Sequence, residues 1–231
     1  MSILGIIPAR GGSKGIKRKN LKILGEKSLL EHTIHAAINS NIEKLIVSTD
    51  DQEIASISKK LGVLVPFLRP KELARDNSNS IDVAIHGLIQ MEKITNSFFE
   101  SIIYLQPTTP FRSSTDINNC LDIINEQNNI DSVISVVNVG SYHPARMKFI
   151  KGGLLIDPDF CEAKENQNRQ ELRPMFIRNG AIYLTKRETL LSGSFKGRSS
   201  FAYEMPYHRS INIDSNQDLD FAKWQLIKNK S

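Results

Sequence analysis

Short apolar runs alternate with segments of helical periodicity over the first 140 residues, and this alternation limits the possible folds more than any other feature. Residues 3–7, 45–47 and 102–105 are apolar runs that lead into polar or turn-forming residues. Between them, segments such as residues 28–38 place apolar side chains on one helical face. The pattern predicts an α/β fold, with a three-layer, mostly parallel sheet flanked by helices.

The same reasoning places the other elements and the position of a ligand. Further strands are expected at residues 63–65 and 133–137, and further helices at 51–61, 80–91, 116–124 and 218–227. Regular structure is expected to resume at residues 180–184. Parallel sheets of this class bind ligands beyond the carboxyl ends of their strands. The loops after Ile7, Val47, Leu105 and Val137 are therefore expected to form the site.

The alternation stops at about residues 138–178. This stretch is polar, contains Gly152 and Gly153, and includes the run EAKENQNRQELR. We expect an insertion lobe inside one domain that spans residues 1–231. A chain of 231 residues with 40% hydrophobic content is long enough to bury a substantial core.

The charge of the chain favours a small anionic partner. The formal net charge is +5, and Lys and Arg are dispersed except for a cluster at Lys14, Lys17, Arg18 and Lys19. A nucleic-acid-binding protein more often concentrates positive charge in a stripe with interleaved aromatic residues. We expect a nucleotide or an acidic metabolite, and no nucleic acid.

Cysteine usage and hydropathy point to a cytoplasmic location. Cys120 and Cys161 are far apart and lack metal-ligand spacing, which favours free thiols in a reducing compartment. The N-terminal residues do not resemble a signal peptide, and no apolar segment approaches about 18 residues. No membrane partner is expected.

A basic, glycine-rich loop, residues 8–20 (PARGGSKGIKRKN), follows the first predicted strand. Glycine lets backbone N–H groups approach a ligand, and Arg10, Lys14 and Lys19 can neutralise a triphosphate. The loop matches neither the Walker pattern nor GxGxxG. A basic surface turn is the alternative, but its place after the first strand favours a phosphate loop.

Six blocks along the chain resemble the N-acylneuraminate cytidylyltransferase family, which also includes enzymes for legionaminic and pseudaminic acids. They occur in the family's order and read IIPARGGSKGIKRKNL, LIVSTDD, LRPKELARD, YLQPTTPFR, RNGAIYL and INIDSNQDLD. The resemblance implies a cytidylyltransferase that couples CTP to the anomeric hydroxyl of a nine-carbon acidic sugar and releases pyrophosphate. It also implies that the insertion lobe packs against a second subunit in a homodimer.

The resemblance assigns nucleotide-binding roles to residues of the phosphate loop and of two later blocks. Arg10 and Lys19 would contact phosphate and act in catalysis, while Asn20 would read the cytosine or position the loop. Arg69 and Ser80 would lie near the base and ribose, although Ser80 is equally well interpreted as a plain helix cap. The complete expected set is Arg10, Gly11, Gly12, Ser13, Lys14, Lys19, Asn20, Arg69 and Ser80.

Three residues match sugar-pocket positions of the family. Gln106 offers a neutral amide that hydrogen-bonds without repelling phosphate. Tyr183 matches a pocket position, and Arg169 can grip the sugar carboxylate through two hydrogen bonds. Arg169 lies in the insertion, so it could reach a neighbouring subunit; a solvated surface charge is the alternative.

The family usually carries an Asp-x-Asp pair that holds magnesium, and here the positions are Asn212 and Asp214. Alternation along a strand would place both side chains on one face. Mg²⁺ accepts one or two carboxylates together with waters and substrate phosphates, so Asp214 can suffice as both metal ligand and catalytic residue. The neutral Asn212 is a departure from the family pattern that could weaken metal binding.

Two other functions stay open at this point. Another sugar nucleotidyltransferase of the same fold would use a different sugar acid or a sugar phosphate. A degenerate, non-catalytic nucleotide-binding protein is compatible with Asn212. The sequence does not distinguish sialic, legionaminic and pseudaminic acids, whose acyl and deoxy differences are worth only a few kcal/mol each.

Overall fold

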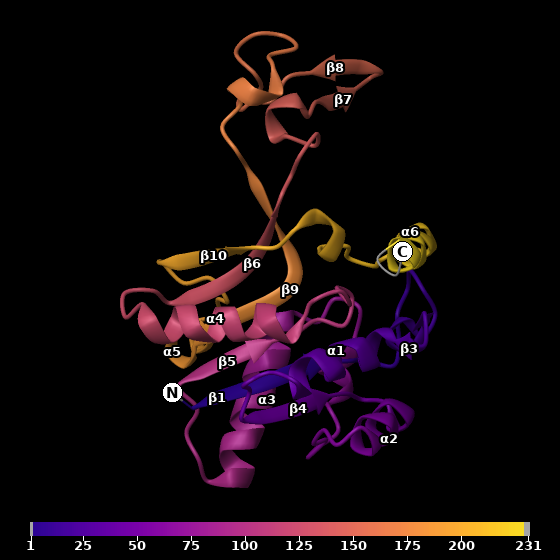
Figure 1. The fold of residues 1–231 in the computed structure, drawn as a ribbon, viewed down its shortest axis with the longest axis vertical. Coiled ribbons are helices and arrows are strands. Elements are labelled where there is room, and N and C mark those ends of the chain that lie inside the picture. Colours follow the sequence, from indigo (N-terminus) through magenta and orange to yellow (C-terminus); the bar gives the residue numbers. More distant parts are fainter. Residues whose placement is uncertain (1, 229–231) are drawn as a thin grey trace.

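The computed structural model describes residues 2–228 and contains one six-stranded sheet (Figure 1). The strand order is β10-β6-β9-β5-β1-β4. All pairings are parallel except those of β9, which runs antiparallel to both β5 and β6. The strands are β1 (Ile3–Pro8), β4 (Lys44–Ser48), β5 (Ser101–Tyr104), β6 (Ser132–Asn138), β9 (Phe176–Lys186) and β10 (Ser200–Glu204). The predicted mostly parallel α/β sheet is confirmed.

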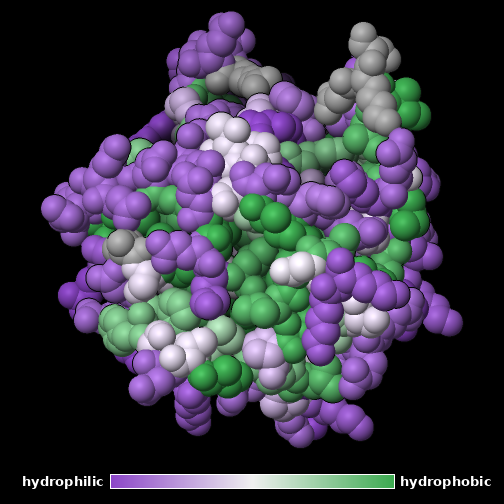
Figure 2. Space-filling model, turned by 60° about the horizontal axis from the view of Figure 1, so that its bottom comes forward, coloured by the Kyte–Doolittle hydropathy of each residue, from purple (hydrophilic) through white to green (hydrophobic). Residues whose placement is uncertain are grey.

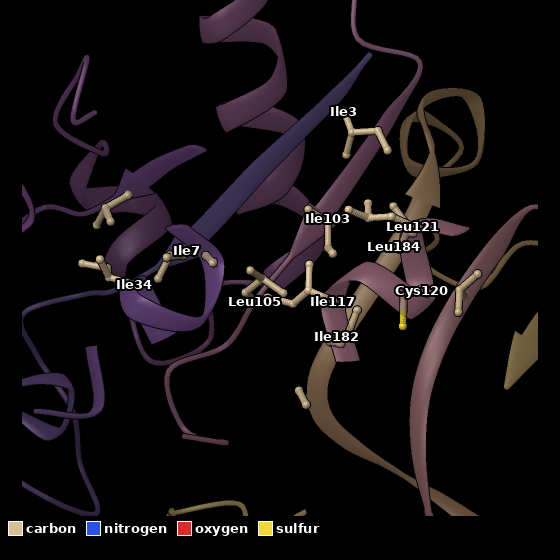
Figure 3. Close-up of a cluster of buried hydrophobic side chains, with 14 of the residues drawn as sticks. Ile3, Ile7, Ile34, Ile103, Leu105, Ile117, Cys120, Leu121, Ile182 and Leu184 are labelled. Atoms are coloured by element: carbon tan, nitrogen blue, oxygen red, sulfur yellow. The ribbon is translucent and has the colours of Figure 1, made fainter. Parts of the chain in front are cut away.

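Helices cover both faces of this sheet. They are α1 (Leu29–Ile38), α2 (Gln52–Lys60), α3 (Ser80–Thr95), α4 (Ser114–Glu126) and α5 (Arg187–Leu191). Helix α6 (Asn216–Lys228) lies apart from the sheet and packs against Leu24 and Leu29 (Figure 1). The larger core lies between the sheet and α1 and α4, where Ile7, Ile103 and Leu184 meet Ile34 and Ile117 (Figure 3). A second core joins the opposite face to α3 and α5.

The helix starts follow the capping signals of the sequence. Ser28 caps α1 in a complete capping box with Glu31, and Asp51 caps α2 through two backbone N–H groups. Ser215 and Asp218 form the equivalent reciprocal pair before α6. These side chains satisfy donors that the first helical turn leaves unpaired.

The structure differs from the predicted elements in several places. The strand expected at residues 63–65 is reduced to one bridge, Ile46 with Leu64. Strand β10 and helix α5 were not predicted, because both are only five residues long and β10 lies at the sheet edge with two exposed apolar side chains. Their position is fixed by tertiary contacts and not by hydrophobic periodicity.

The segment between β6 and β9, residues 139–175, stands away from the sheet and is called the lobe below (Figure 1). It contains a hairpin of β7 (Phe149–Lys151) and β8 (Leu154–Ile156) and two short 3-10 helices, Pro144–Arg146 and Arg169–Glu171. All six residues of these two strands are exposed, including five with large apolar side chains.

Hydrophilic residues cover most of the face seen in Figure 2, and hydrophobic residues collect in a band through its middle. Across residues 2–228, no helix combines the length and the apolar character needed to cross a bilayer.

Candidate active site

A cavity of about 220 Å³ opens at the carboxyl ends of β1 and β5, beside the first turn of α3. The chain leaves β1 toward β4 on one side and later returns to β5 on the other, so the cavity lies where the strand order reverses. Its walls are formed by Pro8, Arg10, Gly12, Ser13, Lys19, Asn20, Arg69, Leu73, Arg75, Asp76, Ser78, Ser80, Val83, Tyr104, Gln106, Pro107 and Thr108.

Most of the expected site residues meet at this cavity. Arg10, Gly12, Ser13, Lys19, Asn20, Arg69, Ser80 and Gln106 all line it. Gly11 and Lys14 belong to the same loop without lining the cavity. Asp214 does not line it either, but its carboxylate pairs with Lys19, which does.

Internal hydrogen bonds hold the phosphate loop in shape. The Ser13 hydroxyl accepts the Lys19 N–H at 3.1 Å and donates to the Ile16 carbonyl, while Asn20 Nδ2 donates to the Arg10 carbonyl at 2.9 Å. The bond from the buried Asn20 is consistent with a role in positioning the loop, and its role in reading the cytosine stays a prediction. These contacts pre-form the loop, which lowers the entropy cost of binding an anion.

The start of α2 anchors the other side of this loop. Gly11 N–H donates to Asp50 Oδ1 at 3.0 Å, and Arg18 pairs with Asp51 and with Glu53. A β-carbon at Gly11 would lie 2.5 Å from Asp51 Oδ2, so only glycine fits between the loop and the helix. Arg18 therefore stabilises the loop from outside the cavity.

Two loop cations share one carboxylate. Arg10 Nη1 lies 3.0 Å from Asp76 Oδ1, and Lys14 Nζ lies 3.1 Å from Asp76 Oδ2. Hydrogen bonding and charge from Lys14, together with the Arg10 charge, hold the pKa of Asp76 below its usual value. Asp76 is the single acidic residue among the side chains that line the cavity.

Arg69 is buried in the cavity wall. Its Nε donates to Ser48 Oγ at 3.1 Å and its Nη2 donates to the Ser48 carbonyl, while its own N–H donates to Thr49 O at 2.7 Å. Burial lowers the pKa of this guanidinium. Arg69 thus fastens the loop before α3 to the end of β4 and adds positive potential to the cavity.

Ser80 is not the helix cap. Asn79 caps α3 by accepting the Ile81 N–H at 3.0 Å, and Ser80 is the first helical residue. Its hydroxyl is hydrogen-bonded to Tyr104, whose pKa is raised by burial to about 12. The alternative interpretation of Ser80 as a cap is therefore wrong, and its side chain belongs to the cavity.

Gln106 lies between β5 and β9 at the cavity edge. A β-carbon at Gly180 would lie 2.8 Å from Gln106 Oε1 and 3.8 Å from Asn212 Oδ1, so both side-chain oxygens face Gly180. The buried Arg112 donates to the Gln106 carbonyl at 3.2 Å, to Ala181 O at 2.5 Å and to Thr33 Oγ1 at 2.8 Å. Arg112 thereby fixes the Gln106 loop to β9 and α1.

The expected metal residues lie at the mouth of the cavity. Lys19 Nζ is 2.7 Å from Asp214 Oδ1, and Asn212 Nδ2 donates to Asp214 Oδ2. The Asp214 side chain is 66% exposed, so its carboxylate is accessible to a cation. The backbone of Asp214 also packs on Gly15, where any β-carbon would clash with its carbonyl.

Tyr183, a further expected residue, does not line the cavity. Tyr183 pairs with Tyr104 across β9 and β5, and both rings pack on Phe195 with centroids 5.2 Å apart. The side chain of Arg169 lies outside the described part of the structure; its backbone starts a 3-10 helix of the lobe. Their sugar-binding roles stay predictions.

Sequence reasoning missed Arg75, Asp76 and Arg112. The first two belong to the block LRPKELARD and Arg112 ends the block YLQPTTPFR, so all three stood within recognised motifs. Arg75 is an exposed cation of the cavity wall. Two adjacent charges of opposite sign before a helix were the available signal, but nothing in the sequence placed them beside Arg10.

A sequence model of the cytidylyltransferase family matches residues 4–149, which contain the phosphate loop, Arg69 and Gln106. This chain belongs to the cytidylyltransferase family. It is 36% identical over 201 residues to a CMP-N,N'-diacetyllegionaminic acid synthase of Legionella pneumophila, covering 84% of this chain and 83% of that protein. It is 35% identical over 223 residues to an N-acylneuraminate cytidylyltransferase of Escherichia coli.

Coverage differs among the relatives of this chain. The E. coli match includes 95% of this chain but 51% of the relative, so the chain spans about half the length of that enzyme. A post-translational flagellin modification protein B of Campylobacter coli is 30% identical over 231 residues, covering 99% of this chain and 96% of that protein.

Solved structures share the fold at low sequence identity. CMP:2-keto-3-deoxy-manno-octonic acid synthetase in complex with CTP matches with a TM-score of 0.72 and 15% identity, over 99% of this chain and 100% of the other. A 4-diphosphocytidyl-2C-methyl-D-erythritol synthase from Anaerococcus prevotii matches with a TM-score of 0.63 and 14% identity, over 97% and 98%. The chain is a nucleotidyltransferase with the fold of these enzymes.

Proposed function

We propose that this cytidylyltransferase couples CTP to the anomeric hydroxyl of a nonulosonic acid, giving the CMP-sugar and pyrophosphate. The observation that carries the proposal is the cavity at the carboxyl ends of β1 and β5, where Arg10, Lys19, Arg69 and Arg75 surround an opening beside a pre-formed glycine-rich loop. The CMP-legionaminate and N-acylneuraminate enzymes named above support this choice of substrates.

In this reaction the oxygen of the sugar hydroxyl forms a bond to the α-phosphorus and its proton is released to solvent, while the bond from the α-phosphorus to the pyrophosphate oxygen breaks. Arg10 and Lys19 offset charge that grows on the departing pyrophosphate, and the N–H groups of residues 11–13 hold the phosphates. Gln106, held by Arg112, orients the sugar near the nucleotide without adding negative charge. Arg169 and Tyr183 are proposed to bind the sugar acid.

The residues at the cavity mouth fit a hard divalent cation, and we propose Mg²⁺. Asp214 would supply one carboxylate oxygen, and Asn212 would supply its carboxamide oxygen once its amide, whose nitrogen donates to Asp214, turns over. The exposed Asp214 leaves room for waters and phosphate oxygens. Within residues 2–228 no cluster of three acidic, histidine or cysteine side chains is available, so substrate phosphates would complete the coordination. Bound there, the ion would neutralise phosphate charge.

We also propose that the single domain carries its insertion, residues 138–178, as a homodimer surface. Exposed apolar side chains of the lobe support this, among them Phe149 (61% exposed), Ile150 (76%) and Leu155 (74%). A patch of this kind on one arm of a protein marks an interaction site. A cytoplasmic location is proposed because the donor is a nucleoside triphosphate and both cysteines are free thiols.

The test measures pyrophosphate release from purified protein with CTP, Mg²⁺ and, side by side, N-acetylneuraminic, legionaminic and pseudaminic acids. One sugar acid is expected to support turnover, and ATP, GTP and UTP are expected to be poor donors. Arg10→Met should lower kcat/KM about 100-fold or more, whereas Lys17→Met, an exposed cation of the same loop, should have little effect. Turnover with none of the three acids would contradict the proposal.

A further inference from the structure

Asp76 is paired with two phosphate-loop cations that a triphosphate would need when it binds in the cavity. Asp76 lies in the short connection, residues 75–79, between the 3-10 helix Lys71–Ala74 and α3. Within residues 2–228, Arg10 and Lys14 are the partners of its carboxylate. The same two cations are those expected to receive phosphate oxygens.

The carboxylate and a polyphosphate cannot both hold these cations at close range. Asp76 takes one oxygen to each cation, at 3.0 Å and 3.1 Å, as a phosphate group would. If it stayed there, it would place a negative charge against the incoming phosphates and repel them. The contact is also easily exchanged, because the side chains of Arg10, Asp76 and Lys14 are 29%, 41% and 81% exposed. Exposed ion pairs contribute little to the stability of a protein.

We infer that Asp76 is an exchangeable counterion of the phosphate site. It neutralises Arg10 and Lys14 in the free protein, is displaced when CTP binds, and returns to the cations as pyrophosphate leaves. This inference rests on the proposed function. It gives Asp76 a defined role in the reaction: it weakens the hold of the enzyme on CTP and pyrophosphate and so favours release of the product.

Binding measured by calorimetry on three ligands tests this role. Asp76→Asn keeps the shape of the side chain and removes its charge, so the affinity for CTP and for pyrophosphate should rise roughly three- to tenfold. CMP, which lacks the departing pyrophosphate, should bind within about twofold of its original affinity. Pyrophosphate should also become a stronger inhibitor of the forward reaction.

Two variants separate this effect from general changes of charge or folding. Glu72→Gln removes an exposed charge from the preceding 3-10 helix, away from the cavity, and should leave all three affinities unchanged. Asp76→Glu keeps the charge and should stay closer to the original protein than Asp76→Asn does.

Weaker or unchanged binding of CTP and pyrophosphate by Asp76→Asn would overturn the inference, as would an equal gain with Glu72→Gln. If the unaltered protein binds CTP, that result leaves the proposed function standing. If the unaltered protein binds pyrophosphate but not CTP, the proposed function fails, and the pyrophosphate measurements still decide the role of Asp76. Binding of neither ligand would overturn both.

Discussion

Single side chains set the chemistry of the cavity mouth. Asn212 stands beside the one carboxylate of Asp214, and Asp214 is already paired with Lys19. A cation that binds Asp214 therefore competes with an ammonium group and receives little help from a neutral neighbour. At this scale the sequence was informative, because the match to an Asp-x-Asp position marked both residues. What the sequence could not show was the Lys19 contact, since 195 residues separate the pair.

Asn212→Asp should lower the Mg²⁺ concentration for half-maximal activity roughly three- to tenfold, because a second carboxylate binds this hard cation more strongly than an amide does. Activity titrated with Mg²⁺ after EDTA treatment measures the shift. Asn216→Asp, an added charge at the start of α6, is the control and should shift it little. An unchanged requirement in Asn212→Asp would argue against metal binding at this position.

Gly180 is the second residue whose identity matters for the cavity. Its φ of +78° strains any other residue, and a β-carbon would press on Gln106 Oε1. Gly180→Ala should lower the free energy of unfolding by about 1–2 kcal/mol, and it should also lower kcat/KM because Gln106 must move. Urea unfolding and steady-state kinetics measure the two effects.

Gly193→Ala is the matched control, because Gly193 has a φ of +86° with open space around its β-position. It should lose similar stability and keep its activity. Equal kinetic losses in both variants would show that strain alone, and not displacement of Gln106, explains the result.

At the scale of elements, hydrophobic periodicity predicted the longer helices that cover the sheet but not the short α5 or the direction of β9. Regular structure was expected to resume at residues 180–184, most of which are buried, and burial by itself does not set the direction of a strand. Its antiparallel course follows from the lobe, which returns the chain from the end of β6 beside that strand. A connection of this length carries no local signal for strand direction, so the sequence left the direction open.

The N-terminus of α4 also organises the site, through the buried Asp116. This carboxylate accepts hydrogen bonds from Ser113 and from Tyr203 OH at 3.0 Å, and it pairs with Arg209. Arg209 begins the segment that carries Asn212 and Asp214. Burial acts to raise the pKa of Asp116, but the bonds from Ser113 and Arg209 outweigh it and hold the pKa below its usual value.

Asp116→Asn should lower the free energy of unfolding at pH 7 by about 2–4 kcal/mol, because it leaves Arg209 without its buried partner. A carboxyl whose pKa is lowered by folding contributes stability above its unfolded pKa of about 3.9 and loses it as the pH falls through the folded value. The difference from the original protein should therefore shrink below about pH 4. Urea unfolding between pH 7 and pH 2.5 measures it.

Asp122→Asn changes an exposed acid of the same helix and should cost little at any pH. A deficit in Asp116→Asn that stays constant from pH 7 to pH 2.5 would show that the lost stability does not come from the ionised carboxylate.

For the molecule as a whole, the six sequence blocks predicted the fold class and the family, and the structure adds how the lobe relates to the sheet. The break in periodicity marked residues 138–178 as unusual. Composition did not reveal that their apolar side chains would remain exposed, because that depends on the absence of a packing partner within the described chain.

Ile150→Glu should convert a homodimer to a monomer, since burying an unpaired charge in an apolar contact costs more than the contact provides. Size-exclusion chromatography with light scattering over a range of concentrations measures the change. Ile94→Glu, at a 55% exposed position on α3, is the control and should not alter the mass. A monomeric original protein would contradict the dimer proposal directly.

Strand β9 has a further consequence for the molecule. Its first residues emerge from the lobe, Gly180 lies against Gln106, and Tyr183 packs behind the cavity wall, all within eleven residues of continuous backbone. A rotation of the lobe relative to the sheet would therefore move β9 and, with it, the residues expected to bind the sugar. The orientation of the lobe and the geometry of the sugar subsite would then both depend on the same stretch of backbone.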